Sequence, residues 1–324
     1  MPLPVTPPLA PQLARAREEL PEGPGWAYEP KLDGFRVIAF VDGGELTLLS
    51  RGGKDLTRYF PEVTLPQGRY VLDGELLIDA ASGAEQPEDF GALQQRIHPA
   101  ASRIRLLSET TPARLAAFDL LAHDDRALLD RPYRERRRAL EDLIAGLPVA
   151  GHPLSLVPSV ADVAVARGWL SGAHEGVVAK EVDAPYLPGQ RRGAVKVKRR
   201  RTADCVVVGY REGKEPGTVG SLMLALHDTA GRLQVVGHTS GLKAAEKRAL
   251  VDELAPLATG EHGTAEPSRW RPDDALAWVA LRPERVVEVT FDQVSGGRIR
   301  HGARLVRWRD DKAPSECLMD QLEG

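Results

Sequence analysis

The chain has 324 residues and a formal net charge of −3, a length sufficient for two domains that each bury a core. No apolar run approaches the length of a membrane span, and the proline-rich start lacks a signal peptide's continuous apolar centre. We therefore expect a soluble, cytoplasmic protein with no membrane partner. The two cysteines, Cys205 and Cys317, lie far apart in sequence, which excludes a four-cysteine zinc site and argues against a disulfide framework.

Short apolar runs dominate the first part of the chain. Residues 35–51 predict a hairpin, because two apolar runs flank an Asp-Gly-Gly turn. The further elements expected here are buried strands at 70–79 and 115–123, a helix at 160–175, and strands at 174–182 and 193–200.

The sequence changes character around residues 201 to 204. From there on, short strands alternate with turns, which is typical of a small closed β-barrel of the oligonucleotide-binding (OB) type. The expected elements are strands at 204–214, 220–228, 232–240 and 285–294 and a helix at 244–254. We therefore predict two domains, residues 1–201 and 202–324.

Positive charge gathers in three places. Residues 134–138, "RERRR", lie in a helix-like segment and are interpreted as a solvated helix face. Residues 190–201 and 298–309 instead interleave arginine and lysine with apolar residues, as strands do. Such strands place several cations on one face of a sheet, where they can bind phosphates.

Lys31 stands two residues before an Asp-Gly turn in "EPKLDGFR". A lysine beside a turn is most often a solvated surface charge. The alternative is a nucleophile held at the mouth of a pocket by the turn at 33–34. A lysine amine attacks phosphorus only after losing its proton, so this alternative requires nearby cations or desolvation.

Six stretches place charged or aromatic residues inside or at the ends of apolar strands, where an isolated charge is costly. They are residues 29–36, 50–53, 72–76, 117–121, 175–180 and 195–198. Their order and spacing, followed by "RWRDDK" at 307–312, resemble the covalent nucleotidyltransferase superfamily. Within it, the chain is most similar to the small bacterial ATP-dependent DNA ligases, including the ligase domain of bacterial end-joining enzymes. The resemblance covers nearly the whole chain.

The resemblance implies an α+β fold, with an adenylation domain of antiparallel sheets and flanking helices followed by an OB-fold β-barrel. It also implies that Lys31 takes AMP from ATP and passes it to the 5′-phosphate at a DNA nick. The 3′-hydroxyl then displaces AMP and seals the strand. The implied cofactors are ATP, as AMP donor, and Mg²⁺ or Mn²⁺, which neutralises phosphate charge.

The nucleotide contacts are also implied by the resemblance. Phe118 stacks on adenine, Glu29 lies near the edge of the base, and Arg36 lies near the ribose and phosphate. Arg51 contacts the nucleotide or the DNA 5′-phosphate, and Glu75 contacts the ribose. Without the resemblance, Phe118 would be interpreted as a core residue and Arg51 as a surface residue beside a turn.

Lys196 and Lys198 are two apart on a predicted strand and therefore share one face. They can supply a positive field for Lys31 and bind the nucleotide phosphates, or they can be two exposed lysines. The resemblance makes Glu175 a ligand of the divalent ion and Glu75 a weaker one. The alternative for both glutamates is a buried ion pair.

Arg309 and Lys312 belong to the "RWRDDK" stretch. The resemblance implies that they orient the pyrophosphate leaving group, and the alternative is an exposed, salt-bridged tail. The chain departs from its relatives at Ala194, where many carry a bulky aromatic. This departure concerns the packing of the 193–200 strand and not the role of its lysines.

The implied partner is nicked duplex DNA, bound by a monomer in DNA repair or recombination, with a DNA end-binding protein or repair polymerase as a further partner. Competing interpretations are an RNA ligase, an RNA-capping guanylyltransferase and a catalytically idle nucleic-acid-binding module. The last does not require Lys31, Glu175, Lys196 and Lys198 together. An NAD-dependent ligase is disfavoured because the chain is short and has no zinc-binding cysteines.

Overall fold

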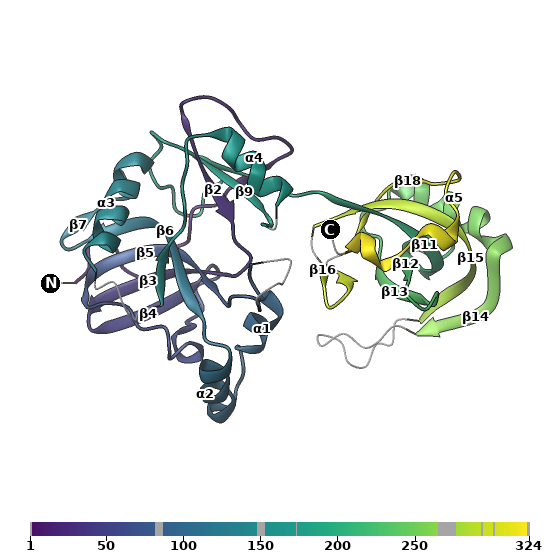
Figure 1. The fold of residues 1–324 in the computed structure, drawn as a ribbon, viewed down its shortest axis with the longest axis horizontal. Coiled ribbons are helices and arrows are strands. Elements are labelled where there is room, and N and C mark those ends of the chain that lie inside the picture. Colours follow the sequence, from purple (N-terminus) through teal and green to yellow (C-terminus); the bar gives the residue numbers. More distant parts are fainter. Residues whose placement is uncertain are drawn as a thin grey trace. The chain divides into compact units, whose positions relative to one another are not determined.

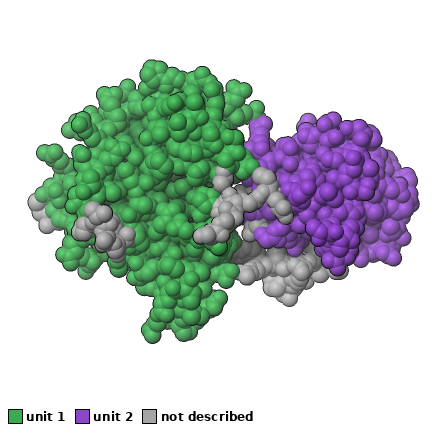
Figure 2. Space-filling model, viewed as in Figure 1, with its two compact units in different colours: residues 1–199 green, residues 200–324 purple. Residues whose placement is uncertain are grey.

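The chain divides into two compact units, residues 1–199 and 200–324 (Figure 2). The computed structural model describes residues 2–81, 87–147, 153–172, 174–264, 277–292, 294–300 and 302–322. The boundary expected between 201 and 202 falls at the start of the long first strand of the second unit, Arg201–Glu212. Each unit has its own hydrophobic core.

A six-stranded sheet forms the larger part of the first unit (Figure 1). Its strand order is β4-β3-β5-β6-β7, with β8 added in parallel to β6. The strands are β3 (Phe35–Gly43), β4 (Glu45–Ser50), β5 (Gly68–Leu77), β6 (Arg114–His123), β7 (Arg126–Ala127) and β8 (Leu154–Leu156). The strands predicted at 35–51, 70–79 and 115–123 are therefore confirmed.

Both faces of this sheet are covered. On β3, Val37 and Ala39 pack into one core cluster while Ile38 and Phe40 pack into another, because successive side chains of a strand point to opposite faces. A strand buried on both faces reads as a continuous apolar run rather than an alternation. This explains the unbroken "VIAFV" of the sequence.

A four-stranded sheet, with order β1-β10-β9-β2, completes the strands of the first unit. Its members are β1 (Arg15–Arg17), β2 (Trp26–Lys31), β9 (Gly176–Glu181) and β10 (Ala194–Lys198). The strands predicted at 174–182 and 193–200 are confirmed as β9 and β10. The sequence did not predict β1, which pairs in parallel with β10 and brings the start of the chain beside it.

Four helices are described in this unit, namely α1 (Phe90–Gln95), α2 (Ala101–Thr110), α3 (Tyr133–Ala145) and α4 (Val163–Ser171). Leu140 of α3 packs into the core of the six-stranded sheet. Ala166 of α4 packs against Tyr28 and Val177 of the other sheet. Asp162 begins α4 by accepting the backbone N–H of Ala164, as a helix N-cap does.

The interpretation of "RERRR" as a solvated helix face is wrong for two of its arginines. Arg136 and Arg137 are buried, with 1% and 8% of their surfaces exposed. Arg136 makes a bidentate ion pair with Asp119 of β6, at 2.8 and 3.0 Å. Arg137 donates to the carbonyl of Val157 at 2.8 Å. Burial of these charges is possible because carboxylate and carbonyl oxygens take the place of water.

The second unit is a β-barrel of antiparallel strands with one flanking α-helix among its described residues (Figure 1). The main sheet has the order β13-β12-β11-β15-β14, and β18 also pairs with β15. Its elements are β11 (Arg201–Glu212), β12 (Val219–His227), β13 (Leu233–His238), α5 (Ala244–Leu254), β14 (Ala258–Thr264), β15 (Ala277–Phe291) and β18 (Arg304–Trp308). A short pair, β16 (Val294–Ser295) and β17 (Arg298–Ile299), lies apart from it.

The core of this unit joins β11, β12 and β15 to the helix. Leu250 and Leu254 of α5 pack with Leu224 of β12 and Val287 of β15. The predicted strands and the predicted helix of this region are confirmed. Among the residues that the structure describes, no helix has the length and apolar character needed to span a membrane.

Candidate active site

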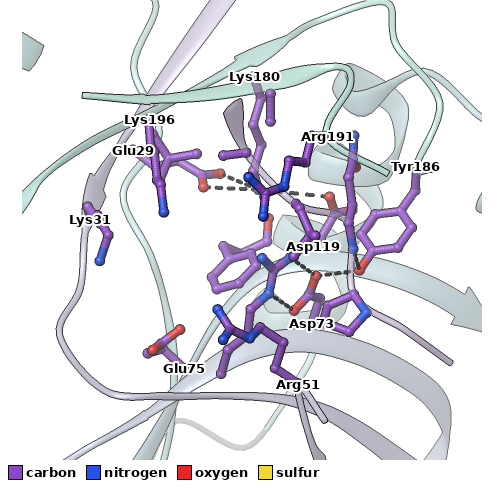
Figure 3. A pocket seen from close by; sticks show the side chains of 18 of the residues that line it. Glu29, Lys31, Arg51, Asp73, Glu75, Asp119, Lys180, Tyr186, Arg191 and Lys196 are labelled. Atoms are coloured by element: carbon purple, nitrogen blue, oxygen red, sulfur yellow. Dashed lines mark hydrogen bonds and ion pairs between the residues drawn. The ribbon is translucent and has the colours of Figure 1, made fainter. Parts of the chain in front are cut away.

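A cavity of about 770 Å³ opens in the first unit, between its two sheets (Figure 3). One side is lined from β2, β9 and β10, and the other from β3, β5 and β6. Residues 10–14 and Ala16 contribute a further wall. The predicted site residues that line the cavity are Glu29, Lys31, Arg36, Arg51, Glu75, Phe118 and Lys196.

Strand pairing places the charged residues of one sheet on the face toward the cavity. Glu29 and Lys196 both lie opposite Val178, from the two strands that flank β9. Because side chains alternate along a strand, Lys31 shares the face of Glu29. Ala194 also lines the cavity, and its small side chain is 9% exposed.

Lys31 lies at the end of β2 and forms an ion pair with Glu175. Lys198 approaches the other oxygen of Glu175, with Nζ 3.2 Å from Oε1. The Glu175 side chain is only 7% exposed, so both lysines bind a carboxylate that is largely shielded from water. The next residue, Gly176, packs so closely on β10 that a Cβ there would collide with the carbonyl oxygen of Val197. Only glycine can follow Glu175 at this place.

Lys196 faces the cavity without an ion-pair or hydrogen-bond partner among the described residues (Figure 3). Burial lowers the pKa of its amine, and the positive charges of Lys31 and Lys198 lower this pKa further. Arg191 adds to the same positive field and lines the cavity. The described part of the chain offers no ion-pair partner to Arg51 or Arg191 either. Three cations of the cavity are thus available to an anionic ligand.

Arg36 is held by a carboxylate of the sheet beneath it. Its Nε and Nη2 donate to the two oxygens of Asp73, at 3.0 and 2.6 Å. The guanidinium carbon lies 5.3 Å from the centroid of the Phe118 ring, within cation–π distance. Asp73 is fully buried, and its negative charge raises the pKa of Arg36, against the effect of burial.

Lys180 connects Glu29 and Phe118. Its amine lies 2.9 Å from Glu29 Oε2, donates to the carbonyl oxygen of Phe118 at 3.1 Å, and lies 4.6 Å from the centroid of that ring. Tyr133 donates to the other oxygen of Glu29 at 2.6 Å. These contacts fix the carboxylate and the ring that were expected to meet the base.

Glu75 is half-buried, and burial raises the pKa of its carboxyl to about 8, although Lys31 and Arg36 oppose the shift. The negative charges of Asp73 and, to a smaller extent, Glu175 add to this rise. The described residues contain no cluster of three or more metal-ligating side chains. Carboxylates such as those of Glu75 and Glu175 are ligands that suit an ion such as Mg²⁺, which takes its remaining ligands from phosphates and water.

Arg309 and Lys312 belong to the second unit. The Nη1 of Arg309 lies 2.8 Å from Asp204 Oδ1, and the amine of Lys312 lies 2.9 Å from Asp204 Oδ2. Asp311 binds the Nε and Nη2 of Arg309 at 2.8 and 2.9 Å. The structure therefore brings these two cations together on one carboxylate.

Two family models match the chain. The model described as "ATP dependent DNA ligase domain" matches residues 7–198, and "ATP dependent DNA ligase C terminal region" matches residues 215–312. The chain belongs to the ATP-dependent DNA ligase family. DNA ligase C1 of Mycolicibacterium smegmatis and DNA ligase C of Mycobacterium tuberculosis are each 44% identical to this ligase. Both alignments cover 100% of this chain and 96% of the relative.

Solved structures agree with this assignment. The ligase domain of M. tuberculosis LigD is 32% identical, with a TM-score of 0.52, and the match covers 96% of this chain and 98% of that one. A mycobacterial DNA ligase D complexed with ATP and MES is 31% identical, with the same coverage and TM-score. The expected fold class, an adenylation domain followed by an OB-type domain, is confirmed.

Several residues of the cavity were missed by sequence reasoning. Asp73, Asp119 and Lys180 lie within stretches that were singled out, but other members of those stretches were chosen. They carried the same sequence signal, a charge inside an apolar strand. Tyr186 lies in a loop and gave no such signal, whereas Arg191 belongs to the basic stretch 190–201 that was expected to bind phosphates.

Proposed function

We propose that this ligase seals nicks in duplex DNA through a covalent lysyl-AMP, with Lys31 as the nucleophile. The observation that carries the proposal is that the Lys31 amine lines a cavity in which Arg51, Arg191 and Lys196 have no ion-pair partner in the described chain. A cavity with this excess of positive charge suits a nucleoside triphosphate, whose phosphates supply the missing anions.

The first step forms a P–N bond. The Lys31 amine loses a proton and attacks the α-phosphorus of ATP, and the bond from that phosphorus to the bridging oxygen breaks to release pyrophosphate. The Lys31 amine is ion-paired with Glu175, so attack requires Glu175 to move away or to accept the proton that the amine loses.

The later steps return the lysine to its starting form. An oxygen of the DNA 5′-phosphate attacks the phosphorus of lysyl-AMP, the P–N bond breaks, and Lys31 regains its proton. The 3′-hydroxyl then loses its proton and attacks the 5′-phosphate, and AMP leaves. Lys196 and Arg51 are proposed to neutralise the phosphate oxygens in each displacement, since both face the cavity unpaired in the described structure.

The base and ribose are proposed to lie near β6. Phe118 offers a ring for stacking, and Glu29, fixed by Lys180 and Tyr133, offers a carboxylate to the adenine amino group. Arg36 is proposed to bind the ribose or the α-phosphate. A divalent ion held by Glu175 and Glu75 would supply positive charge to the phosphates.

DNA repair in the cytoplasm is the proposed setting, with a DNA end-binding protein or repair polymerase as a further partner. What supports duplex DNA as the substrate is membership of the ligase family together with exposed arginines beside the cavity, Arg191 and Arg192. Exposed cations of this kind bind the phosphate backbone without reading base sequence.

The test follows covalent label and sealing in one experiment. The purified chain is incubated with Mg²⁺ and α-labelled ATP, α-labelled GTP or NAD labelled in its adenylate, and then receives nicked DNA or nicked RNA duplex. We expect the protein to take label from ATP alone, and to lose that label as free AMP when the nick in DNA is sealed. Label from GTP would indicate a guanylyltransferase, and sealing confined to RNA would indicate an RNA ligase. A folded protein that takes no label would contradict the proposal.

A further inference from the structure

Residues 10–16 form a further wall of the nucleotide cavity. This wall is separate from β2, β9 and β10 on one side and from β3, β5 and β6 on the other. Backbone hydrogen bonds hold this segment in place, since the N–H of Leu13 donates to the carbonyl of Gln190 at 2.8 Å. The side-chain amide of Gln12 donates to the carbonyl of Arg192 at 2.5 Å. Ala16 then lies opposite Lys196 in the parallel pairing of β1 with β10.

Tyr186 joins this wall to the floor of the cavity (Figure 3). Its hydroxyl accepts the backbone N–H of Gln12 at 2.9 Å and donates to Asp73 Oδ2 at 2.6 Å. The residue is 3% exposed, and burial together with the charge of Asp73 raises the pKa of the phenol well above its ordinary value. The hydroxyl therefore keeps its proton throughout the neutral pH range and remains a hydrogen-bond donor to Asp73.

Asp73 has no access to water, so its two oxygens depend on protein donors. They receive the two hydrogen bonds from Arg36 and the one from Tyr186. Oδ2 is shared between Tyr186 and the Nη2 of Arg36, both at 2.6 Å. The phenol thus fixes the rotation of the carboxylate, and the carboxylate fixes the plane of the Arg36 guanidinium beside Phe118.

We propose that Tyr186 is a positioning residue for nucleotide binding, which acts through Asp73 to orient Arg36 and ties residues 10–16 to the cavity. The inference rests on the proposed function in one respect, namely that the cavity binds ATP. The inference predicts that removal of the Tyr186 hydroxyl alone weakens ATP binding. Because this hydroxyl is buried, such a loss would not be a general effect of changing the protein surface.

The first test measures ATP affinity at equilibrium without chemistry. Tyr186→Phe is made in a Lys31→Ala background, and ATP binding is followed by calorimetry. Loss of a hydrogen bond to a buried carboxylate is expected to raise Kd about tenfold. The matched control is Tyr70→Phe, which removes the hydroxyl of another buried tyrosine, one that donates to the carbonyl of Pro66 instead. Its ATP affinity is expected to stay unchanged.

A double-mutant cycle separates positioning from a general loss of structure. Tyr186→Phe and Arg36→Ala are combined, and Kd is compared with the two single variants. If Tyr186 acts through Arg36, the phenylalanine adds less than about a twofold effect once Arg36 is absent. The inference would be overturned if the double variant raised Kd by the full product of the two single effects. An unchanged Kd in Tyr186→Phe itself would also overturn it.

The two proposals fail in different ways. Tight ATP binding that depends on Tyr186, in a chain that neither takes covalent label nor seals nicks, would sustain the inference and overturn the ligase mechanism. If labelling and sealing are normal and Tyr186→Phe does not change the Kd for ATP, the mechanism stands and the inference is overturned. Failure of the wild-type chain to bind ATP would overturn both.

Discussion

One nitrogen of the Arg309 guanidinium, Nη1, donates to both carboxylate oxygens of Asp204, at 2.8 and 3.0 Å. Lys312 binds the same carboxylate, and the Asp204 side chain is 13% exposed. Gln321 holds the backbone of Asp204 in turn, by accepting its N–H at 2.9 Å. Arg309 and Lys312 are therefore anchored to the first strand of the second unit, which distinguishes them from an exposed tail.

Lys31→Ala is expected to abolish covalent AMP labelling and leave the fold intact. Lys31 is partly exposed at the end of its strand, so truncation removes an amine without opening a core cavity. Glu175 loses one partner but keeps Lys198, which limits the cost of the unpaired carboxylate. Labelling is measured on a denaturing gel after incubation with ATP.

The control for this change is Lys54→Ala, which removes an exposed lysine from the same unit. It should label as the wild type does. Circular dichroism of both variants tests the fold. Undiminished labelling in a folded Lys31→Ala protein would defeat the assignment of the nucleophile.

Glu88→Gln is expected to stabilise the protein at pH 8 and to leave its stability unchanged near pH 4. Burial raises the pKa of the Glu88 carboxyl to about 7, from 4.5 in a model peptide. The folded state thus binds more protons than the unfolded state between these values, and the free energy of unfolding falls as pH rises through this window. Above it, the ionised carboxylate costs about 3 kcal/mol, which glutamine avoids.

Urea unfolding of the whole chain at pH 4, 6 and 8 measures this effect. Glu45→Gln, at an exposed position, provides the control and should change stability equally little at every pH. A stability difference for Glu88→Gln that grows toward acid pH would have the wrong sign and would refute the burial argument.

DNA binding is expected to depend steeply on salt and little on sequence. The loop before β10 carries Arg191 and Arg192, both exposed, and such cations release counterions when they meet phosphates. Arg192→Ala should lower the slope of log affinity against log salt by about one unit. Fluorescence anisotropy with duplexes of several sequences measures this slope.

Arg138→Ala is the matched control, because Arg138 is an exposed arginine of helix α3 in the same unit. Its slope should equal that of the wild type. A salt response that stays flat for the wild-type chain, or tight binding to one sequence only, would contradict binding through the backbone.

The strands could be predicted because their signals are local. Residues 35–51 contain two apolar runs around a turn and form the hairpin of β3 and β4, and the apolar runs at 70–79 and 115–123 form one strand each. β1 gave no such signal, since all three of its residues are exposed and only its pairing with β10 defines it. The helix α2 was missed for a similar reason, because Ile104 and Leu107 are its only buried residues.

Site residues could be predicted where their own type and place on a strand are unusual. They could not be predicted where only a contact with another residue marks them. Lys31 and Phe118 stood out because charge or an aromatic ring marks the end or middle of a strand. Lys180 lies 151 residues from Glu29, and Arg136 was taken for a surface charge until Asp119 was found beside it. Such pairs are set by tertiary packing, which one sequence does not record.

The remaining prediction concerns Arg309 and Lys312 together. If they orient pyrophosphate, replacing both by alanine should suppress lysyl-AMP formation from ATP by about a hundredfold, the scale of losing two charge-assisted hydrogen bonds. Sealing of a nick that already carries a 5′-adenylate should fall far less, because pyrophosphate has left before that step. The control is Arg304→Ala, an exposed arginine of β18.

Both activities are measured on the same preparations, with nicked DNA adenylated in advance for the second. The two activities of the double variant can be compared because both cations bind Asp204. Their removal leaves this carboxylate near the surface unpaired and creates no cavity in the core. Thermal unfolding should therefore shift only slightly. Equal losses in the two assays would assign the pair to general DNA contact. No loss in either assay would mean that the bonds to Asp204 serve only the fold of the second unit. Cations that contact the pyrophosphate leaving group cannot be removed without slowing its departure.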